Sequence, residues 1–184
     1  MEVITTLEDL NSLKVNGGGI IPFCKNENEY LFLFGRECLD KKWEESGKWG
    51  EFGGKFNEGE SNLDGIIREF YEESHGLFGN KEELKKYLEK NIKNLLILFC
   101  KHYDGLVIFL PINFNVDLPK YFKNAIFITK EILGRKGAIK TAQSKGYFEK
   151  DEVSFFSIKE LNKKEIFRKN LKEINKYLIE KFNS

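Results

Sequence analysis

The amino-acid sequence predicts a single α+β domain in which a central mixed β-sheet lies between helices. Runs rich in β-branched and aromatic residues alternate along the chain with two substantial amphipathic segments, a pattern typical of a sheet covered by helices. The 184 residues are enough for one hydrophobic core, and no stretch rich in Pro, Gly and Ser divides them. We therefore expect one domain over residues 1–184.

The N-terminal part of the chain predicts a short helix followed by a β-hairpin. Thr6 precedes Asp9 by three residues, which is a weak helix-capping pattern, and leucines follow at helical spacing. Two β-rich runs, residues 17–25 and 29–37, then flank a short polar turn. These runs indicate an early hairpin.

A helix with one apolar face is expected after the Trp- and Gly-rich loop 40–54. Leu63, Ile66 and Phe70 recur every three to four residues, which is the spacing of one helix face. Gly76 stands where a left-handed glycine would end this helix. The apolar face predicts that the helix packs on the sheet.

The second half of the chain predicts further strands and a final helix. Residues 95–101 and 106–114 are β-rich runs joined by a tight turn, and residues 152–158 indicate a late strand. We expect residues 117–148 to form an insertion with one helix and a loop rich in Lys and Gly. An amphipathic helix over about 158–182 should end the chain.

Composition favours a soluble protein, and the uneven charge leaves open an anionic ligand. Hydrophobic residues make up 41% and charged residues 32%, no apolar run can span a bilayer, and the N-terminus lacks the features of a signal peptide. We expect a cytoplasmic protein without a membrane partner. Residues 120–184 carry 16 Lys and Arg against 8 Asp and Glu. These cations either face an anion such as RNA or only form the water-exposed faces of helices.

The cysteine pattern predicts neither disulfides nor a zinc site. Cys24, Cys38 and Cys100 are odd in number and far apart in the sequence. We expect them to be ordinary, mostly buried thiols.

Three glutamates are crowded on one face of the predicted helix. Glu69, Glu72 and Glu73 stand at positions i, i+3 and i+4, so their carboxylates should project from one patch beside the apolar face. Each like-charged pair costs an isolated helix about 0.2–0.5 kcal/mol unless a cation neutralises it. Carboxylate ligands with no His or Cys nearby favour Mg²⁺ or Mn²⁺ over Zn²⁺. The sequence therefore predicts a divalent metal site.

Residues 54–77 resemble the Nudix box, a motif of the form Gly-x5-Glu-x7-Arg-Glu-U-x-Glu-Glu-x-Gly-U in which U is a bulky apolar residue. The matching residues are Gly54, Glu60, Arg68, Glu69, Phe70, Glu72 and Glu73. By chance these identities would recur on the order of once per million positions. The departure is at the end, where Ser74 and His75 precede Gly76, and we interpret the extra residue as a one-residue extension of the helix. The resemblance implies a Nudix-type α/β/α sandwich.

The resemblance to the Nudix family also implies the roles of the box residues. Glu69, Glu72 and Glu73 would bind the metal together with the carbonyl oxygen of Gly53. One of the glutamates would double as the base or orient the water, with Glu69 and Glu72 as the catalytic candidates. Arg68 would support them.

Two further residues of the box, and one residue outside it, are candidates by the same resemblance. Glu60 would hold the cluster in shape with Arg68, and Gly54 would be a structural glycine. Family members often take another acidic ligand from a loop before the late strand. Glu149 is the candidate here, with Asp151 and Glu152 as rivals.

Substrate contacts are expected from Lys55, Trp49 and Trp43. Lys55 could add positive charge at the glycine loop, and the two tryptophans could stack on a nucleobase or simply pack in the core.

The function implied by the resemblance is metal-dependent hydrolysis of a phosphoanhydride bond in a nucleoside diphosphate-linked substrate. Nucleotide sugars, dinucleotides, nucleoside triphosphates and capped RNA are all candidates, because a bound metal would activate water and neutralise phosphate oxygens in each case. The alternative is a non-catalytic Nudix-fold module that binds a nucleotide or RNA through its basic third. A homodimer is left open.

Overall fold

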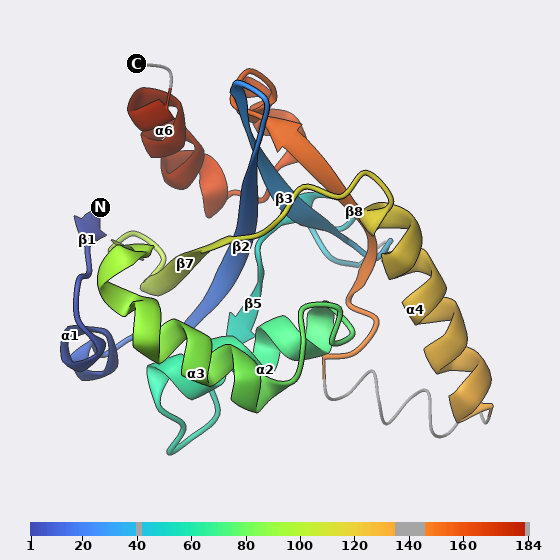
Figure 1. Cartoon of the computed structure of the whole chain (residues 1–184), viewed down its shortest axis with the longest axis horizontal. Helices are drawn as coiled ribbons and strands as arrows, with labels where there is room; N and C mark the ends of the chain where they lie inside the picture. The colour runs from blue at the N-terminus through green and yellow to red at the C-terminus, as the bar shows by residue number, and fades with distance from the viewer. Residues whose placement is uncertain (40–41, 135–145, 183–184) are drawn as a thin grey trace.

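A mixed β-sheet forms the middle layer of the protein (Figure 1). The computed structural model describes residues 1–39, 42–134 and 146–182. The strands are β1 (Glu2–Val3), β2 (Gly17–Asn26), β3 (Glu29–Glu37), β4 (Trp49–Gly50), β5 (Phe52–Lys55), β6 (Leu96–Cys100), β7 (Gly105–Pro111) and β8 (Lys150–Ser157). Their order is β1-β6-β7-β2-β3-β4, with β5 also paired to β2 and β8 to β3. The strand pairs are antiparallel except β2 with β7, which is parallel.

Helices cover both faces of this sheet, which confirms the predicted α/β/α arrangement. One face carries α1 (Leu7–Ser12), α2 (Asn62–Glu73) and α3 (Lys81–Asn91), and the other carries α6 (Leu171–Phe182). Strand side chains alternate between the two faces. On β2, for example, Ile20 packs in the core under α2 and α3, whereas Ile21 packs in the core under α6.

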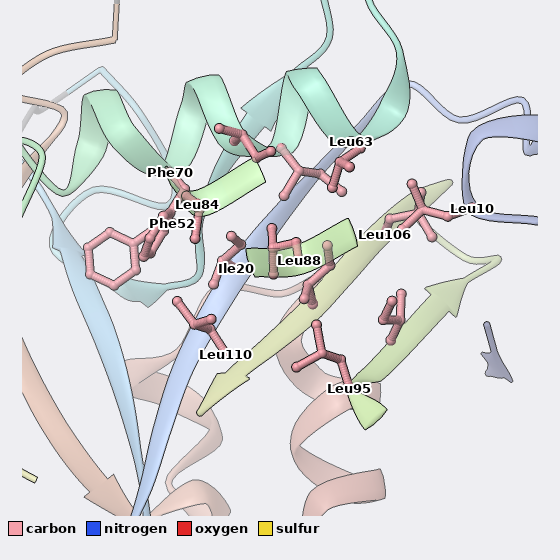
Figure 2. Close-up of a cluster of buried hydrophobic side chains, with 14 of the residues drawn as sticks. Leu10, Ile20, Phe52, Leu63, Phe70, Leu84, Leu88, Leu95, Leu106 and Leu110 are labelled. Carbon is pink, nitrogen blue, oxygen red and sulfur yellow. The ribbon is translucent and has the colours of Figure 1, made fainter. Parts of the chain in front are cut away.

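The core under α2 and α3 fixes the position of the site helix (Figure 2). Leu63 and Phe70 of α2 face Ile20 and Phe52 of the sheet, and the rings of Phe52 and Phe70 meet edge to face at 5.7 Å. Fully burying one such side chain contributes about 1.5–3 kcal/mol relative to leaving it exposed. The phase of the apolar residues therefore decides which side of α2 faces away from the sheet.

Polar contacts also fix the start of α2. The Ser61 side chain caps the helix by accepting a hydrogen bond from the Asp64 N–H at 3.2 Å. The Asn62 side chain donates hydrogen bonds to the backbone oxygens of Leu10 and Leu13, at 2.7 and 2.8 Å. These contacts tie α2 to the end of α1.

The end of α2 differs from the prediction. The helix stops at Glu73, and His75, with φ 53°, takes the left-handed position that glycine usually occupies. The Gly76 N–H bonds to the oxygen of Tyr71 at 3.0 Å, and the His75 N–H to that of Glu72 at 3.3 Å. This is the Schellman pattern, so the predicted one-residue extension of the helix is wrong. His75 stands in the place of the box glycine.

One helix was not predicted, and one was predicted too long. The unpredicted helix is α3, which begins with a capping box between Asn80 and Glu83. The predicted helix over 158–182 begins only at Leu171, after two short 3-10 turns, η2 (Glu160–Asn162) and η3 (Lys164–Ile166). Between these turns and α6, Phe167 is buried and extended and bridges to Trp49, which excludes a continuous helix.

The predicted insertion 117–148 contains one described helix, α4 (Leu118–Leu133), which runs beside β8 (Figure 1). The predicted Lys- and Gly-rich loop falls on 135–145 and lies outside the described residues. None of the described helices combines the length and apolar character needed to cross a bilayer. Cys24, Cys38 and Cys100 are free thiols, as predicted.

Candidate functional site

A cavity of about 530 Å³ lies beside the side of α2 that carries Arg68, Glu69 and Glu72. Its described lining comprises Gly54, Lys55, Asn57, Arg68, Glu69, Glu72, Gly146 and Glu149. Three carboxylates, those of Glu69, Glu72 and Glu149, therefore share one cavity, and we call them the cavity carboxylates. The first two project from α2, and the third comes from the residue just before β8.

Arg68 is held firmly at the floor of this cavity. Its Nε and Nη2 atoms donate to the two oxygens of Glu60 at 2.9 and 3.0 Å, and Nη2 also donates to the Lys55 backbone oxygen at 3.0 Å. The hydrogen bond with Glu60 raises the pKa of Arg68. Burial alone would raise the pKa of Glu60, but the Arg68 guanidinium lowers it. This bidentate pair joins the loop before α2 to the helix.

The remaining nitrogen of Arg68 lies between two of the cavity carboxylates. Nη1 is 2.6 Å from Glu69 Oε1 and 3.3 Å from Glu72 Oε2, and Lys81 Nζ is 3.5 Å from the other oxygen of Glu72. Burial raises the pKa of Glu69 even though Arg68 acts to lower it. In this arrangement no three His, Cys, Asp or Glu side chains of the described residues are gathered closely enough to hold a metal ion.

Two glycines of β5 lie close to α2 and to β2. A Cβ atom on Gly54 would lie 2.6 Å from Glu69 Oε2, and one on Gly53 would lie 2.4 Å from the Gly18 oxygen. A side chain at the first position would displace the Glu69 carboxylate, and the second position needs glycine so that β5 can pair with the backbone of β2. The Glu69 carboxylate thus packs directly against the backbone at Gly54.

Glu73 does not join the other glutamates of the box. Its side chain is only 1% exposed, its Oε2 accepts a hydrogen bond from the Gly53 N–H at 2.6 Å, and its Oε1 lies 3.4 Å from Lys150 Nζ. The predicted single patch of three carboxylates is therefore wrong, because α2 turns Glu73 toward β5 and β8. The contact with Gly53 is made by its N–H, whereas the prediction concerned its carbonyl oxygen.

Glu73 belongs to a buried ion cluster, which we define as Glu37, Glu73, Lys150 and Arg168. The Lys150 ammonium contacts Glu37 and Glu73, and Arg168 Nη1 is 3.1 Å from Glu37 Oε1. Burial raises the pKa of Glu73 well above its usual range, while Lys150 counteracts this. Burial would lower the pKa of Lys150, but the carboxylates of Glu73 and Glu37 raise it. Two carboxylates and two cations therefore meet in this cluster, with Arg168 the least buried of the four.

Among the three candidates for a further acidic ligand, the structure brings Glu149 to the cavity. Asp151 and Glu152 are instead paired with Arg36, whose Nε lies 2.8 Å from Asp151 Oδ1 and whose Nη2 lies 3.0 Å from Glu152 Oε2. Asp151 and Glu152 lie within β8, where Glu152 pairs in register with Arg36 of β3, whereas Glu149 precedes the strand.

Of the three expected substrate contacts, the structure places Lys55 at the cavity, Trp49 in packing contacts and Trp43 at an exposed position. Lys55 is exposed and lines the cavity. Trp49 packs edge to face on Phe156 at 5.0 Å, and Trp43 lies beside the Arg168 guanidinium. Neither tryptophan is among the described residues that line the cavity, so Trp49 takes the packing role that was the alternative to base stacking.

A second cavity, of about 190 Å³, adjoins the first and was not foreseen from the sequence. It shares Gly54 and Lys55 with the first cavity. Among the residues that line it, four buried polar atoms have no hydrogen-bond partner: Glu51 Oε2, Tyr103 OH, Arg168 Nε and Asn170 Oδ1. Their segments are far apart in the chain, and no local pattern indicates that they meet. Unpaired buried polar groups cost free energy until a ligand or water pairs with them.

Comparison with known proteins gives structural likeness at low sequence identity. No protein-family model matches the chain, and no curated protein matches its sequence. An Ap4A hydrolase of C. elegans, solved as a binary complex, is similar over 89% of this chain and 93% of its own, with 14% identity and a TM-score of 0.46. A mutT/nudix family protein from Listeria innocua covers 94% of this chain and 96% of its own, with 13% identity and a TM-score of 0.46.

A third similar structure is the MutT protein from Methanosarcina mazei Go1. It covers 95% of this chain and 96% of its own, with 17% identity and a TM-score of 0.43. The structures to which this chain is similar thus include Nudix and MutT proteins.

Proposed function

We propose that this protein is a Nudix-type hydrolase that cleaves a phosphoanhydride bond in a nucleoside diphosphate-linked substrate with the help of Mg²⁺ or Mn²⁺. The observation that carries the proposal is the meeting of Glu69, Glu72 and Glu149 in one cavity under the glycine loop. Glu149 comes from a segment about 80 residues away in sequence, so helix periodicity alone does not account for its presence.

The donor chemistry of the cavity suits a hard divalent cation. Its acidic groups are all carboxylates, which Mg²⁺ and Mn²⁺ prefer, and Arg68 and Lys81 leave their charge incompletely balanced. We propose Glu69, Glu72 and Glu149 as the ligands, which requires Glu69 and Glu72 to turn away from Arg68 Nη1. When bound, such an ion would lower the pKa of a water molecule and neutralise phosphate oxygens.

The chain's own residues would orient the substrate. Lys55 stands at the rim shared by the two cavities, where an ammonium group can bind a phosphate. Arg68 remains paired with Glu60 and so keeps α2 aligned with the glycine loop. Glu73 would act as a positioning residue, since its bond to the Gly53 N–H holds β5 against α2.

The test is a hydrolysis screen with matched variants. The purified protein is incubated with Mg²⁺ or Mn²⁺ and a panel of dinucleoside polyphosphates, nucleotide sugars, nucleoside triphosphates and capped RNA, and products are followed by chromatography. We expect Glu69→Gln/Glu72→Gln to slow turnover by about 10²- to 10⁴-fold, the usual contribution of positioned acid–base groups. The control, Glu82→Gln/Glu89→Gln, removes two exposed carboxylates from α3 and should keep wild-type activity. Equal rates for the wild type and the site variant would end the proposal.

One observation favours a second function, a non-catalytic module that binds a nucleotide or RNA. Arg68 bridges Glu69 and Glu72, and Lys150 neutralises Glu73, so protein cations already contact the three box glutamates. A module of this kind would bind nucleotides without metal and would hydrolyse none of the panel. Its binding affinity would fall steeply as the salt concentration rises. The same screen, with binding measured in EDTA, separates the two functions.

A further inference from the structure

Helix α4 is the most apolar of the four long described helices, yet it buries the fewest residues. Its mean hydropathy exceeds that of α2, α3 and α6, and Phe122 is its only fully buried residue. Four large apolar side chains remain exposed, namely Tyr121 (45%), Phe127 (64%), Ile128 (53%) and Ile132 (78%). In Figure 1, α4 stands at the edge of the fold beside β8. Because an apolar helix is normally covered on more than one side, we expect a further surface to pack against α4.

The exposed side chains of α4 lie on the side that faces away from the core. Phe122 and, one turn later, Ile126 pack in the core under α2 and α3, which defines the inward side of the helix. With 3.6 residues per turn, a set of exposed residues occupies the outward side. They are Lys120, Tyr121, Asn124, Phe127, Ile128, Glu131 and Ile132, and we call them the outer face of α4.

The outer face carries one positive and one negative charge on the same line along the helix. Lys120 and Glu131 are eleven residues apart, which corresponds to three turns or about 16 Å. Lys123 of α4 pairs with Glu152 of β8, whereas neither Lys120 nor Glu131 forms an ion pair with a described residue. The face is therefore positive near the start of α4 and negative near its end, and a partner can pair with both charges.

Two conceivable occupants of the outer face match it poorly. A lipid surface would take Glu131 out of water without giving it a counter-charge. Residues 135–145 contain a single large apolar side chain, Ile139, against the four that α4 exposes. The face requires a partner with matching apolar side chains and with the opposite order of charges.

A second copy of the chain meets this requirement when the two α4 helices run antiparallel. A two-fold axis near the middle of α4 places Lys120 of each copy opposite Glu131 of the other, so that two ion pairs form together. Phe127 and Ile128 of both copies then meet beside the axis. A parallel pair would instead place like charges opposite each other. The outer face is thus complementary to itself in the antiparallel orientation, as a symmetric interface requires.

We propose that the protein forms a homodimer through antiparallel packing of the outer faces of two α4 helices. The proposal does not depend on the proposed hydrolase, because the described lining of the cavity of the carboxylates includes no residue of the outer face. One helix from each copy makes the contact, so the buried area lies near the lower limit of about 1,000 Å² for a specific interface. We therefore expect a monomer–dimer equilibrium that shifts with protein concentration.

The first experiment measures the mass of the full-length protein by sedimentation equilibrium, from low micromolar to submillimolar concentrations. The weight-average mass should rise from 21.5 kDa toward twice that value. Phe127→Glu/Ile128→Glu crowds like charges beside the two-fold axis and should weaken dimerisation by about 30-fold or more. The control, Leu39→Glu/Tyr87→Glu, makes the same charge change at two exposed apolar positions outside α4 and should leave the dimer affinity within about twofold of the wild type.

Charge reversal tests the partner and its orientation together. Lys120→Glu places glutamates opposite each other at both ends of the interface, and Glu131→Lys does the same with lysines. Each single variant should therefore dimerise about 5- to 50-fold more weakly than the wild type. A mixture of the two variants should recover the wild-type affinity, because each contact then joins opposite charges. The double variant Lys120→Glu/Glu131→Lys should recover it as well.

The proposal is overturned if the wild type stays monomeric at every concentration, if the dimer survives Phe127→Glu/Ile128→Glu, or if the single charge variants do not recover on mixing. Sedimentation with vesicles of phosphatidylcholine and phosphatidylserine identifies the rival occupant. A monomeric wild type that binds these vesicles, with binding lost in Phe127→Glu/Ile128→Glu, would assign the outer face to a membrane instead. All of these readouts are masses, so a failure of the proposed hydrolase would leave them unchanged.

Discussion

Glu72 and Glu73 are neighbours in sequence, yet they belong to two acidic regions with opposite electrostatics. Glu72 lies among the cavity carboxylates, where Arg68 contacts Glu69 and Glu72 while paired with Glu60, Lys81 contacts Glu72, and Lys55 lines the cavity. Glu73 lies in the buried ion cluster, where Lys150 and Arg168 balance it and Glu37. The comparison teaches that neighbouring acidic residues of one motif can line a cavity in one case and join a buried ion cluster in the other.

The physical difference between the two regions is solvent. Charges in the buried ion cluster have lost their water, so each carboxylate needs a cation at contact distance. The cavity carboxylates border open space, where water can solvate, or a bound ion can neutralise, the negative charge that Arg68 leaves unpaired. Excess negative charge is therefore tolerated in the cavity, and it makes the cavity suitable for a cation.

The largest effect on stability should come from breaking the buried ion cluster. Lys150→Met removes the ammonium group that both carboxylates contact, so that Glu37 keeps Arg168 and Glu73 keeps the Gly53 N–H but no cation of the cluster, and we expect the free energy of unfolding to fall by about 3–5 kcal/mol. Urea unfolding followed by circular dichroism measures this change. Lys159→Met, at an exposed position, is the control and should change it by less than about 0.5 kcal/mol. A loss below about 1 kcal/mol for Lys150→Met would show that the cluster is not what we describe.

Replacing each of the two neighbouring glutamates by uncharged glutamine tests whether they differ in their contribution to stability. Glu73→Gln should lower the free energy of unfolding by about 1–3 kcal/mol, because Lys150 loses a counter-charge and the Gly53 N–H a charged acceptor. Glu72→Gln should change it by less than about 0.5 kcal/mol, since its contacts border the cavity. The same urea measurement tests both variants, and similar losses at the two positions would refute the division into two regions.

A smaller effect, dependent on pH, is expected at the end of α2. Burial lowers the pKa of His75 from 6.5 to about 4. Because the unfolded chain then binds a proton that the folded protein excludes, stability should fall as the pH drops from about 6.5 to about 4. We expect this loss to be about 1–2 kcal/mol, since the ring is only partly buried.

The variant His75→Asn isolates this contribution. Asparagine tolerates the left-handed backbone at this position and does not titrate, so the part of the pH dependence due to His75 should vanish. Urea midpoints measured between pH 7.5 and pH 4.5 give the comparison. An unchanged pH dependence in the variant would mean that the imidazole is protonated equally in both states.

Much of the fold followed from periodicity, and the exceptions have local causes. Helix α2 carries apolar residues at the spacing of one buried face, whereas strands β2, β3 and β8 are β-rich runs that bury residues on both faces of the sheet. Helix α3 buries few residues and has a weak apolar pattern, but the Asn80 and Glu83 capping box was a usable signal. The start of α6 was hidden because the preceding turns also place apolar residues at helical spacing.

The sequence by itself determined the helix that carries the acidic motif and the phase of its apolar residues. Tertiary structure alone decided that Glu73 is buried, that Glu149 rather than Asp151 meets the cavity, and that His75 packs against Phe122 and Phe148. The physical reason is that spacing along one helix sets the direction of a side chain. Its solvation and its counter-charges come from strands that reach it from distant parts of the chain.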